Sequence, residues 1–395
     1  MGEAVPAEDA IRTVMQGVVD PELGADLVDL GMYQGAEVAA DGSVTVEVAL
    51  TTAGCPLRAQ IARDVKDRVG SLPGVTSVAV RTVEMSSQQK KAVMARARAR
   101  AAEQPVATEV PPRTRVLAVS SGKGGVGKSS VTVNLAAALA ARGLTVGLLD
   151  ADIAGFSVPR MLGLEGQLTA QPGPDGKPRI EPLVKAFGAG SIRVVSMGFL
   201  SPEDEAIMWR GQMLNRGVQH FLEEVAWGDL DYLLVDMPPG TGDIQMGLAR
   251  MLPRAEMLIV TTPALAAQKV AARAADMARK GYLRVAGVIE NMSGFECAHG
   301  ERYDLFGSGG GARLAQEIGV PLLASIPIQP EVSAGGDAGR PAAVGESAAA
   351  MAFAHLVDAV MEAVPVVDVT GCTARMLDDI RRRLDGPREQ DSPQD

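Results

Sequence analysis

Cysteine, long apolar runs and surplus positive charge are all scarce in this sequence of 395 residues. Its three cysteines, Cys55, Cys297 and Cys372, are too few and too scattered for a disulfide framework, so we expect reduced thiols. No stretch of about 20 apolar residues is present, and we therefore expect no membrane-spanning helix. The first ten residues carry acids rather than a basic stretch before an apolar run, so we expect no secretory signal. Together these absences predict a cytoplasmic location.

Acidic residues outnumber basic ones, 48 to 38, and the formal net charge is −10. This balance disfavours general affinity for nucleic acid or for anionic membranes, so we expect neither as a partner. The chain is long for one domain, and 47% of its residues are hydrophobic, which is ample material for more than one core. Two domains are therefore the starting expectation.

The central motif is a glycine-rich loop between a predicted strand and a predicted helix. Residues 116–119 form a short apolar run, and residues 131–141 continue without a helix breaker. Between these segments lies the motif G-x-x-x-x-G-K-[ST], which is typical of a loop whose backbone N–H groups turn toward phosphate oxygens. The N-terminus of the following helix adds partial positive charge. We therefore predict a nucleotide-phosphate site made by Gly122, Lys123, Gly124, Gly125, Val126, Gly127, Lys128, Ser129 and Ser130.

Carboxylates follow two further predicted strands, at the ends where the nucleotide is expected. One apolar run leads into Asp150 and Asp152, and another leads into Asp236, with Asp243 in the text that follows. Phosphoryl transfer requires acidic groups near the γ-phosphate, one to hold the metal ion and one to orient water. Asp150 and Asp243 are expected to support these two roles.

The residue types predict a role for each main side chain in ATP hydrolysis. Lys128 is expected to neutralise the β- and γ-phosphates. Ser129 and Asp236, the latter directly or through water, are expected to hold Mg²⁺. Asp152 is the candidate that orients or activates the attacking water. The N-K-x-D motif that recognises guanine is absent from the sequence, and this absence favours ATP as the nucleotide.

Lys123, inside the loop, narrows the class of nucleotide-binding protein. The form K-G-G-x-G-K-[ST] resembles the deviant phosphate loop of the MinD/ParA group of ATPases. The resemblance implies a homodimer in which Lys123 reaches the nucleotide of the partner subunit and so belongs to the catalytic set.

Further motifs lie at predicted strand ends and turns: Asp150-Ala-Asp-Ile153, Ser157-Val-Pro159, Met161-Leu-Gly163, Asp236-Met-Pro-Pro-Gly-Thr-Gly-Asp243, Thr261-Thr-Pro263, Glu290-Asn-Met-Ser293 and Phe306-Gly-Ser-Gly-Gly-Gly311. As a set, from about Arg115 to about Val364, they resemble the Mrp/ApbC family of iron–sulfur cluster carrier ATPases. The resemblance implies that a cluster is bound and transferred to apo iron–sulfur proteins, with assembly factors as partners. By resemblance to related ATPases, Asn291 contacts the adenine.

Cys297 marks a departure from that family. Cluster-carrying members have a C-x-x-C pair after the Glu-Asn-Met-Ser segment, and a pair from each of two subunits holds one cluster. Here Gly300 stands where the second cysteine is expected. Either His299 replaces a thiolate, as imidazole does in some clusters, or the site has decayed and Cys297 and His299 are ordinary loop residues.

The segment from Glu8 to about Met85 has the pattern of a small α+β domain. Helices are predicted at 10–18 and 57–69, and strands at 44–50 and 75–83. Its motifs resemble the small domain of PaaD- and SufT-type iron–sulfur assembly factors: Asp20-Pro-Glu-Leu-Gly24, Val28-Asp-Leu-Gly31 and Leu50-Thr-Thr-Ala-Gly-Cys55-Pro-Leu57. Cys55 is either a thiolate favoured by the following helix N-terminus or a small apolar filler.

The remaining text predicts a mostly parallel, doubly wound α/β sheet of the P-loop NTPase kind, with its ligand at the carboxyl ends of the strands. Strands are expected at 116–120, 145–150, 193–196, 232–236, 257–261, 285–291 and 321–326, with helices such as 215–225 and 268–280. Residues 166–182 are expected to form a surface loop. We divide the chain into a small domain at 1–86, a linker at 87–112 without apolar periodicity that demands burial, the ATPase domain at 113–366 and a C-terminal tail at 367–395.

Two other functions compete with the cluster-carrying ATPase. One is a nucleotide-dependent scaffold that binds partner proteins and carries no cluster, which Gly300 favours. The other is a MinD/ParA-like positioning ATPase, which requires a membrane helix or a basic DNA-binding face. Residues 376–384 are amphipathic but short and mixed in charge, so this reading ranks lowest.

Overall fold

The computed structural model describes residues 5–20, 25–50, 57–86, 88–90, 92–93, 96, 108–152, 155–173, 177–199, 211–240, 248, 251–280, 283–297 and 299–366. Three residues singled out above, Cys55, Asp243 and Cys372, lie outside these ranges, as does the amphipathic segment 376–384. In the described ranges, no helix is both long enough and apolar enough to cross a membrane.

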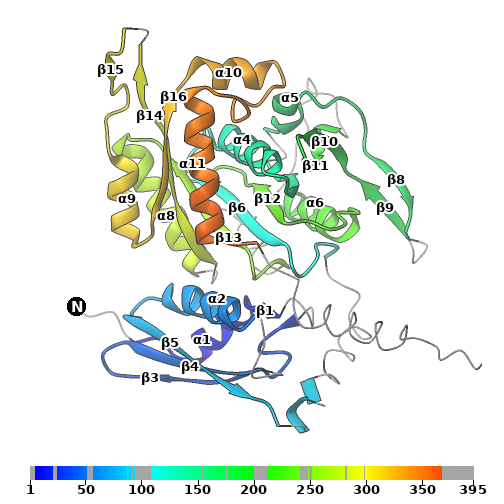
Figure 1. Cartoon of the computed structure of the whole chain (residues 1–395), viewed down its shortest axis with the longest axis vertical. Helices are drawn as coiled ribbons and strands as arrows, with labels where there is room; N and C mark the ends of the chain where they lie inside the picture. The colour runs from blue at the N-terminus through cyan, green and yellow to red at the C-terminus, as the bar shows by residue number, and fades with distance from the viewer. Residues whose placement is uncertain are drawn as a thin grey trace, which may run out of the picture.

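A sheet of nine described strands forms the centre of the larger part of the chain (Figure 1). Its order is β10-β11-β7-β12-β6-β13-β14-β15, with β16 also paired to β14. The pairs are parallel except for β10 with β11 and β14 with β15. The predicted mostly parallel α/β fold is therefore confirmed. The strands are β6 (Arg115–Ser121), β7 (Thr145–Asp150), β10 (Leu183–Phe187), β11 (Gly190–Ser196), β12 (Tyr232–Asp236), β13 (Glu256–Thr261), β14 (Arg284–Glu296), β15 (Arg302–Tyr303) and β16 (Leu322–Ile328).

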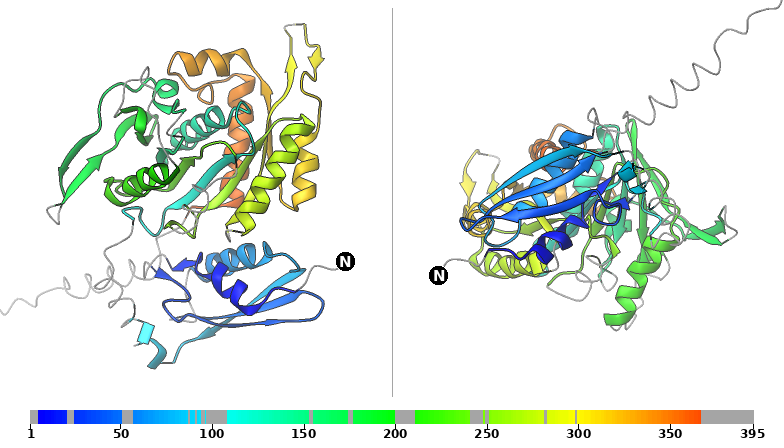
Figure 2. Two further views of the ribbon diagram at one scale, coloured as in Figure 1. Left: turned by 180° about the vertical axis from the view of Figure 1, so that it is seen from behind. Right: turned by 90° about the horizontal axis from the view of Figure 1, so that it is seen from below.

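Helices cover both faces of this sheet (Figure 2). One core joins the strands to α6 (Gly211–Glu224), α8 (Leu265–Lys280) and α9 (Gly310–Ile318). The other core joins them to α4 (Lys128–Ala141), α5 (Val158–Leu162) and α11 (Ala348–Ala363). Successive residues of β6 alternate between the two cores, Val116 and Ala118 in the first and Leu117 and Val119 in the second. This is why the central strands read as continuous apolar runs rather than alternating ones.

Several segments differ from the sequence-based expectations. Residues 166–182, predicted as a loop, contain the antiparallel strands β8 (Thr169–Pro172) and β9 (Pro178–Glu181). The Gly- and Pro-rich sequence of this segment predicts a loop. In the hairpin, however, Pro172 and Pro178 lie opposite each other at the ends of the two strands. The predicted strand 285–291 extends to Glu296. Strands β3 (Tyr33–Val38) and β10, the 3-10 helix η1 (Met197–Phe199) and helix α10 (Pro330–Asp337) were not predicted.

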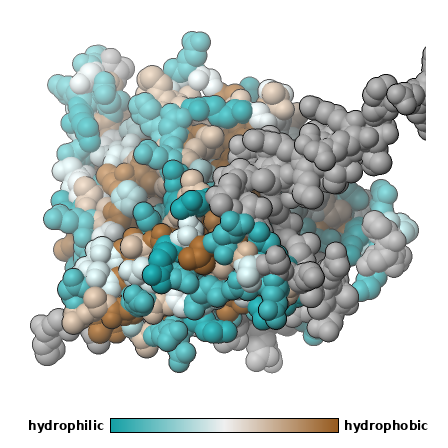
Figure 3. All heavy atoms as spheres, turned by 60° about the horizontal axis from the view of Figure 1, so that its bottom comes forward, coloured by the Kyte–Doolittle hydropathy of each residue, from teal (hydrophilic) through white to brown (hydrophobic). Residues whose placement is uncertain are grey.

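The N-terminal part forms a separate three-stranded sheet with two helices and its own core. Strand β4 (Ser43–Leu50) lies between β3 (Tyr33–Val38), to which it is antiparallel, and β5 (Ser77–Glu84), to which it is parallel. The two helices pack against this sheet through buried residues that include Ile11, Val65 and Val69. Seen from this end, the surface mixes hydrophilic and hydrophobic side chains (Figure 3). The other elements are α1 (Glu8–Met15), α2 (Arg58–Gly70), β1 (Val19–Asp20) and β2 (Ala25–Asp26).

The segment predicted as a linker has buried residues at both of its ends. Val93 is 2% exposed and packs in the N-terminal core, and Arg96 donates to the Leu30 carbonyl at 3.3 Å. Val110 is also 2% exposed and packs in the core of the larger part. The lack of apolar periodicity in this segment therefore does not prevent burial of single apolar residues such as Val93 and Val110.

Candidate functional site

The glycine-rich loop joins the carboxyl end of β6 to the first turn of α4, as the sequence predicts. Gly125 and Gly127 both have φ of 80°, a left-handed conformation that favours glycine, and Gly127 is the N-cap of α4. A Cβ atom on Gly122 would overlap the backbone of Val270 in α8. Small residues therefore let the loop wind closely around the helix N-terminus, where backbone N–H groups and the helix dipole favour an anion.

Lys128 and Ser129, at the start of α4, meet the carboxylate at the end of β12. The Lys128 ammonium donates to Asp236 Oδ1 at 2.7 Å, and the Ser129 hydroxyl donates to Asp236 Oδ2 at 2.5 Å. Thr132 Oγ1 lies 3.0 Å from Asp236 Oδ1 and 2.9 Å from the Lys128 carbonyl oxygen, so its single proton is shared between these two acceptors. The Asp236 side chain is 1% exposed, so Lys128 supplies its countercharge and the Ser129 and Thr132 hydroxyls replace hydrogen bonds to water.

Asp152 lies on the other side of the Lys128 ammonium, with its Oδ2 at 3.9 Å from Nζ. Its side chain is 17% exposed. Burial raises the pKa of Asp152, while the attraction of Lys128 opposes that rise. A partly buried carboxylate beside the phosphate loop, with a raised pKa, is suited to accept a proton.

Asp150 is fully buried beneath this group at the end of β7. Its Oδ2 accepts the Ser196 hydroxyl at 3.1 Å and the Ser157 backbone N–H at 3.3 Å, and its Oδ1 accepts the Asp152 backbone N–H at 3.2 Å. Burial, followed by repulsion from Asp236, raises the pKa of Asp150 to about 7. These bonds hold the backbone that carries Asp152.

Asn291 of β14 lies against the phosphate loop. Its Nδ2 donates to the Val126 carbonyl at 2.9 Å, and a Cβ atom on Gly127 would overlap it. Both Asn291 and Gly127 line a pocket of about 380 Å³ beside α4. Other walls of the pocket are Arg160, Met161, Met292, Gln329 and Asp337.

Lys123 lies on the surface of the loop. The side chain is exposed, and its backbone carbonyl accepts the Ser121 hydroxyl at 3.0 Å. The structure of one chain therefore does not bring Lys123 to the Lys128–Asp236 group, and its predicted role concerns a neighbouring subunit.

Cys297 stands at the tip of the hairpin formed by β14 and β15. Its backbone N–H donates to the Glu301 carbonyl at 2.9 Å, and the Gly300 N–H donates to the Cys297 carbonyl at 2.9 Å. The Cys297 side chain is a free thiol of intermediate exposure, and His299 is exposed. In the described part of the chain, no three His, Cys, Asp or Glu side chains form a group suited to a metal ion.

Gly300 has a geometric reason to be glycine in this turn. Its φ is 79°, and no atom lies within 4 Å of the position where a Cβ would stand. A residue with a side chain therefore fits the space but is strained by the backbone conformation.

One contact and one unusual backbone conformation at the site escaped the sequence-based prediction. Thr132 follows Lys128 by one helical turn, a spacing that places both on the Asp236 side of α4. Met292 has φ of 57° in the middle of β14, next to Asn291. Backbone outliers of this kind in a residue with a side chain cost energy and cluster at functional sites, but nothing in the amino-acid text signals them.

Comparison with protein families gives two matches. A family described as NUBPL iron-transfer P-loop NTPase matches residues 113–361, and one described as iron–sulfur cluster assembly protein matches residues 8–80. The chain belongs to this family of iron-transfer P-loop NTPases. The resemblance inferred from the motifs is therefore confirmed.

Curated relatives of this family are similar over most of their length. An iron–sulfur cluster carrier protein of Mycobacterium tuberculosis is 44% identical over 339 residues, which cover 84% of this chain and 87% of the relative. Another, from Deinococcus radiodurans, is 46% identical over 348 residues, 87% and 92% of the two chains. Among solved structures, a nucleotide-binding protein of Archaeoglobus fulgidus in complex with ADP is 37% identical, with a TM-score of 0.48, over 57% of this chain and 86% of that one.

Proposed function

We propose that this member of the family is an ATP-hydrolysing carrier that binds an iron–sulfur cluster and delivers it to apo iron–sulfur proteins. The observation that carries the proposal is that the nucleotide-site residues and Cys297 lie at the same edge of the sheet. The Lys128–Asp236 group follows the carboxyl ends of β6 and β12, and Cys297 follows the carboxyl end of the parallel strand β14. A nucleotide site and a candidate cluster ligand therefore share the edge where α/β sheets bind ligands.

The nucleotide is assigned to the loop and to the pocket beside it. In this proposal the loop N–H groups and Lys128 bind the phosphates, and Asn291 contacts the adenine in the pocket of about 380 Å³. Asp152 takes the proton of the attacking water or orients it. Asp150 positions Asp152 through the hydrogen bond to its backbone N–H.

Mg²⁺ fits the same residues. A hydroxyl and a carboxylate, the oxygen donors that Mg²⁺ prefers, already lie 2.5 Å apart at Ser129 and Asp236. The bound ion supplies positive charge to the phosphate oxygens. Ser129 and Asp236 would hold it, and Lys128 would then turn from Asp236 to the phosphates.

The proposal also includes the division of the chain into domains, its cellular location and its partners. Separate cores support the proposed small domain at 1–86 and ATPase domain at 113–366, although Val93 and Val110 of the intervening segment also pack into these two cores. In this proposal the carrier is cytoplasmic and its partners are assembly factors and apoproteins. The net charge of −10 disfavours nucleic acid and anionic membranes as partners. The named relatives favour the carrier over the scaffold and over the positioning ATPase.

Lys123→Ala tests whether the working form is a homodimer with shared sites. We expect the variant to lose most ATP hydrolysis, because an exposed lysine on the loop acts on the nucleotide of the neighbouring subunit. Mixing it with inactive Asp152→Asn protein is expected to restore activity, since one site of each mixed dimer then holds both Asp152 and a partner's lysine. Phosphate release measured over a range of mixing ratios is the readout. A lack of any rescue, or a monomer in the presence of ATP and Mg²⁺, would contradict the shared site.

Cys297→Ala tests the cluster site. After anaerobic reconstitution, the wild-type protein is expected to bind about one cluster per dimer, because each chain offers one thiolate at this hairpin. The variant is expected to lose the visible absorption and the bound iron, with Cys372→Ala as the control that keeps them.

The other results of this experiment assign different functions. Retention of iron in Cys297→Ala together with its loss in Cys55→Ala would move the cluster to the N-terminal domain. ATP hydrolysis without an iron–sulfur signal in any variant would favour the scaffold. If the cluster uses His299, the wild-type protein is expected to lose iron as the pH falls toward about 6, because imidazole coordinates only when neutral.

A further inference from the structure

The N-terminal part contacts the larger part at the edge of the sheet opposite the nucleotide site. The contact involves the first residues of the parallel strands: Arg115 of β6, Glu256 of β13 and Arg284 of β14. Because parallel strands all begin at the same edge, these side chains form a row of alternating charge there. Phosphate-site residues lie at the other ends of these strands or just beyond them, so the two surfaces do not overlap.

Helix α2 presents the complementary charges. Asp64, Asp67 and Arg68 follow one another at helical spacing on one side, while Ile61 and Val65 face the N-terminal core. Helix α2 therefore has two distinct faces. One is apolar and packs in the N-terminal core, and the other is charged and contacts the larger part of the chain.

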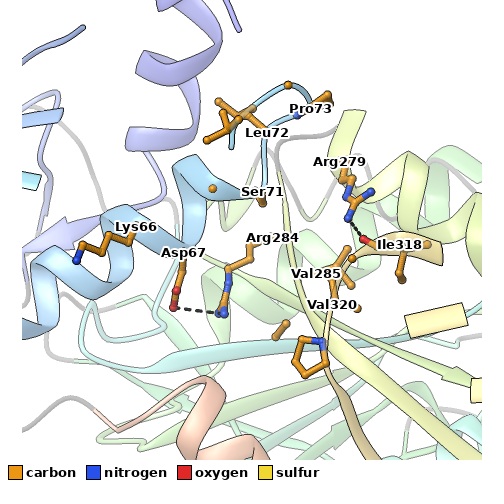
Figure 4. Close-up of a pocket in the computed structure, with 16 residues that line it drawn as sticks. Lys66, Asp67, Ser71, Leu72, Pro73, Arg279, Arg284, Val285, Ile318 and Val320 are labelled. Atoms are coloured by element: carbon orange, nitrogen blue, oxygen red, sulfur yellow. Dashed lines mark hydrogen bonds and ion pairs between the residues drawn. The ribbon is translucent and has the colours of Figure 1, made fainter. Parts of the chain in front are cut away.

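Ion pairs join the two rows. Asp64 accepts two hydrogen bonds from the Arg115 guanidinium, at 3.0 and 3.2 Å, in a bidentate arrangement. Asp67 lies 3.3 Å from Arg284 (Figure 4). Arg284 also pairs with Glu256. The side chains in these ion pairs are all less than a third exposed, with 13% for Arg115 and 32% for Asp67.

Arg68 enters a slot at the centre of this contact. Its guanidinium donates to the carbonyls of Pro253, at 3.0 Å, and Arg254, and the residue is 4% exposed. The slot exists because residue 17 is glycine: a Cβ there would overlap the guanidinium and would stand 2.8 Å from the Pro253 carbonyl oxygen. The Arg68 side chain therefore joins α2 directly to the backbone of Pro253 and Arg254.

The contact is nevertheless poorly filled. A pocket of about 510 Å³ lies along it, between the end of α2 with the following turn and the start of β14 (Figure 4). Burying charges is costly, and buried ion pairs contribute little net stability compared with apolar packing. Polar interfaces between domains commonly permit relative motion.

We propose that the N-terminal domain docks on the amino-terminal edge of the ATPase sheet through a charged interface pinned by Arg68, and that this interface opens and closes in solution. Opening hydrates the charged residues and separates Arg68 from the Pro253 and Arg254 carbonyls without disturbing either core. This inference goes beyond the cluster-carrying function and does not depend on it.

Arg68→Glu in the full-length chain tests the pin. The substitution places a carboxylate against two carbonyl oxygens, so the docked form is expected to be lost while the residue becomes solvated in the open form. A compact chain of this length has a radius of gyration on the order of 21 Å, and we expect small-angle X-ray scattering of the variant to show an increase of roughly a tenth or more. Arg58→Glu, the same charge change at an exposed position of α2, is the matched control and is expected to match the wild-type profile.

Two further measurements complete the test. Gly17→Ala is expected to expand the protein as well, because it blocks the slot without changing any charge. Wild-type protein is expected to expand between roughly 0.05 M and roughly 1 M salt. The charged residues are exposed in the open form, and a Debye length that falls to about 3 Å screens the attraction that brings the two parts together again. Circular dichroism and nucleotide affinity, measured on every variant, establish that the domains remain folded.

Each contrary result overturns a defined part of the proposal. If the Arg68→Glu protein stays compact, Arg68 does not hold the interface closed. If the scattering profile of the wild-type protein does not change with salt, the interface does not open in solution. If light scattering shows that the variant instead loses a subunit, the charged face joins two chains rather than two domains. Loss of ATP hydrolysis in all proteins would contradict the proposed function and leave the scattering result intact.

Discussion

Lys128→Ala is expected to reduce ATP hydrolysis by on the order of 10²–10³-fold or more. The lysine is the cation closest to the expected phosphates and is only 6% exposed, so no solvent ion replaces it easily. Phosphoryl transfer relies on such fixed charges, because the transition state spreads negative charge over the phosphate oxygens. We expect nucleotide affinity to fall as well, since the same charge acts in the ground state.

The substitution also disturbs the protein without nucleotide. Lys128 donates to Asp236 at 2.7 Å, and buried Asp150 lies near enough for Asp236 to raise its pKa. Removing the ammonium leaves two buried carboxylates without their cation, and breaking a buried pair in this way costs about 3–5 kcal/mol. Thermal unfolding must therefore accompany the kinetics. Lys269→Ala, which removes an exposed lysine of α8, is the control and is expected to keep full activity. Normal hydrolysis in folded Lys128→Ala protein would contradict the assignment.

The sheet and the phosphate loop were predictable because their signals are local. Strands β7 and β12 are buried on both faces, so each appears in the sequence as an unbroken apolar run that ends in a carboxylate. The parallel arrangement then brings Asp150 and Asp236 to one edge, as the register of β12 on β7 shows, with these two residues paired.

Other features depend on partners that are distant in sequence. Arg68 and Pro253 are separated by 185 positions, and nothing in the text near either predicts their contact. The hairpin of β8 and β9 was missed because glycine and proline, which usually mark loops, here stand at the ends of short paired strands. Thr132 was missed for a different reason: its spacing from Lys128 was visible, but a threonine within a helix rarely signals a role at a site.

Asp152→Asn is expected to separate nucleotide binding from hydrolysis. The amide has nearly the same shape as the carboxylate but accepts no proton, so the step that depends on the attacking water is expected to slow by on the order of 10²–10⁴-fold. Nucleotide affinity is expected to change little, because Asp152 lies 3.9 Å from Lys128 and is not among the groups assigned to the phosphates or to Mg²⁺. Equilibrium binding of a fluorescent ATP analogue and single-turnover hydrolysis measure the two effects separately.

The pH dependence of hydrolysis distinguishes a proton acceptor from a merely structural carboxylate. Burial raises the pKa of Asp152, so the wild-type rate is expected to fall as the pH drops through that raised pKa, where the acceptor becomes protonated. Asp152→Asn is expected to lack this acidic limb, whereas Asp358→Asn, at an exposed position on α11, is expected to keep it. If Asp152→Asn instead loses nucleotide affinity to the same extent as Lys128→Ala, Asp152 acts in binding, and the attacking water must be oriented by another group.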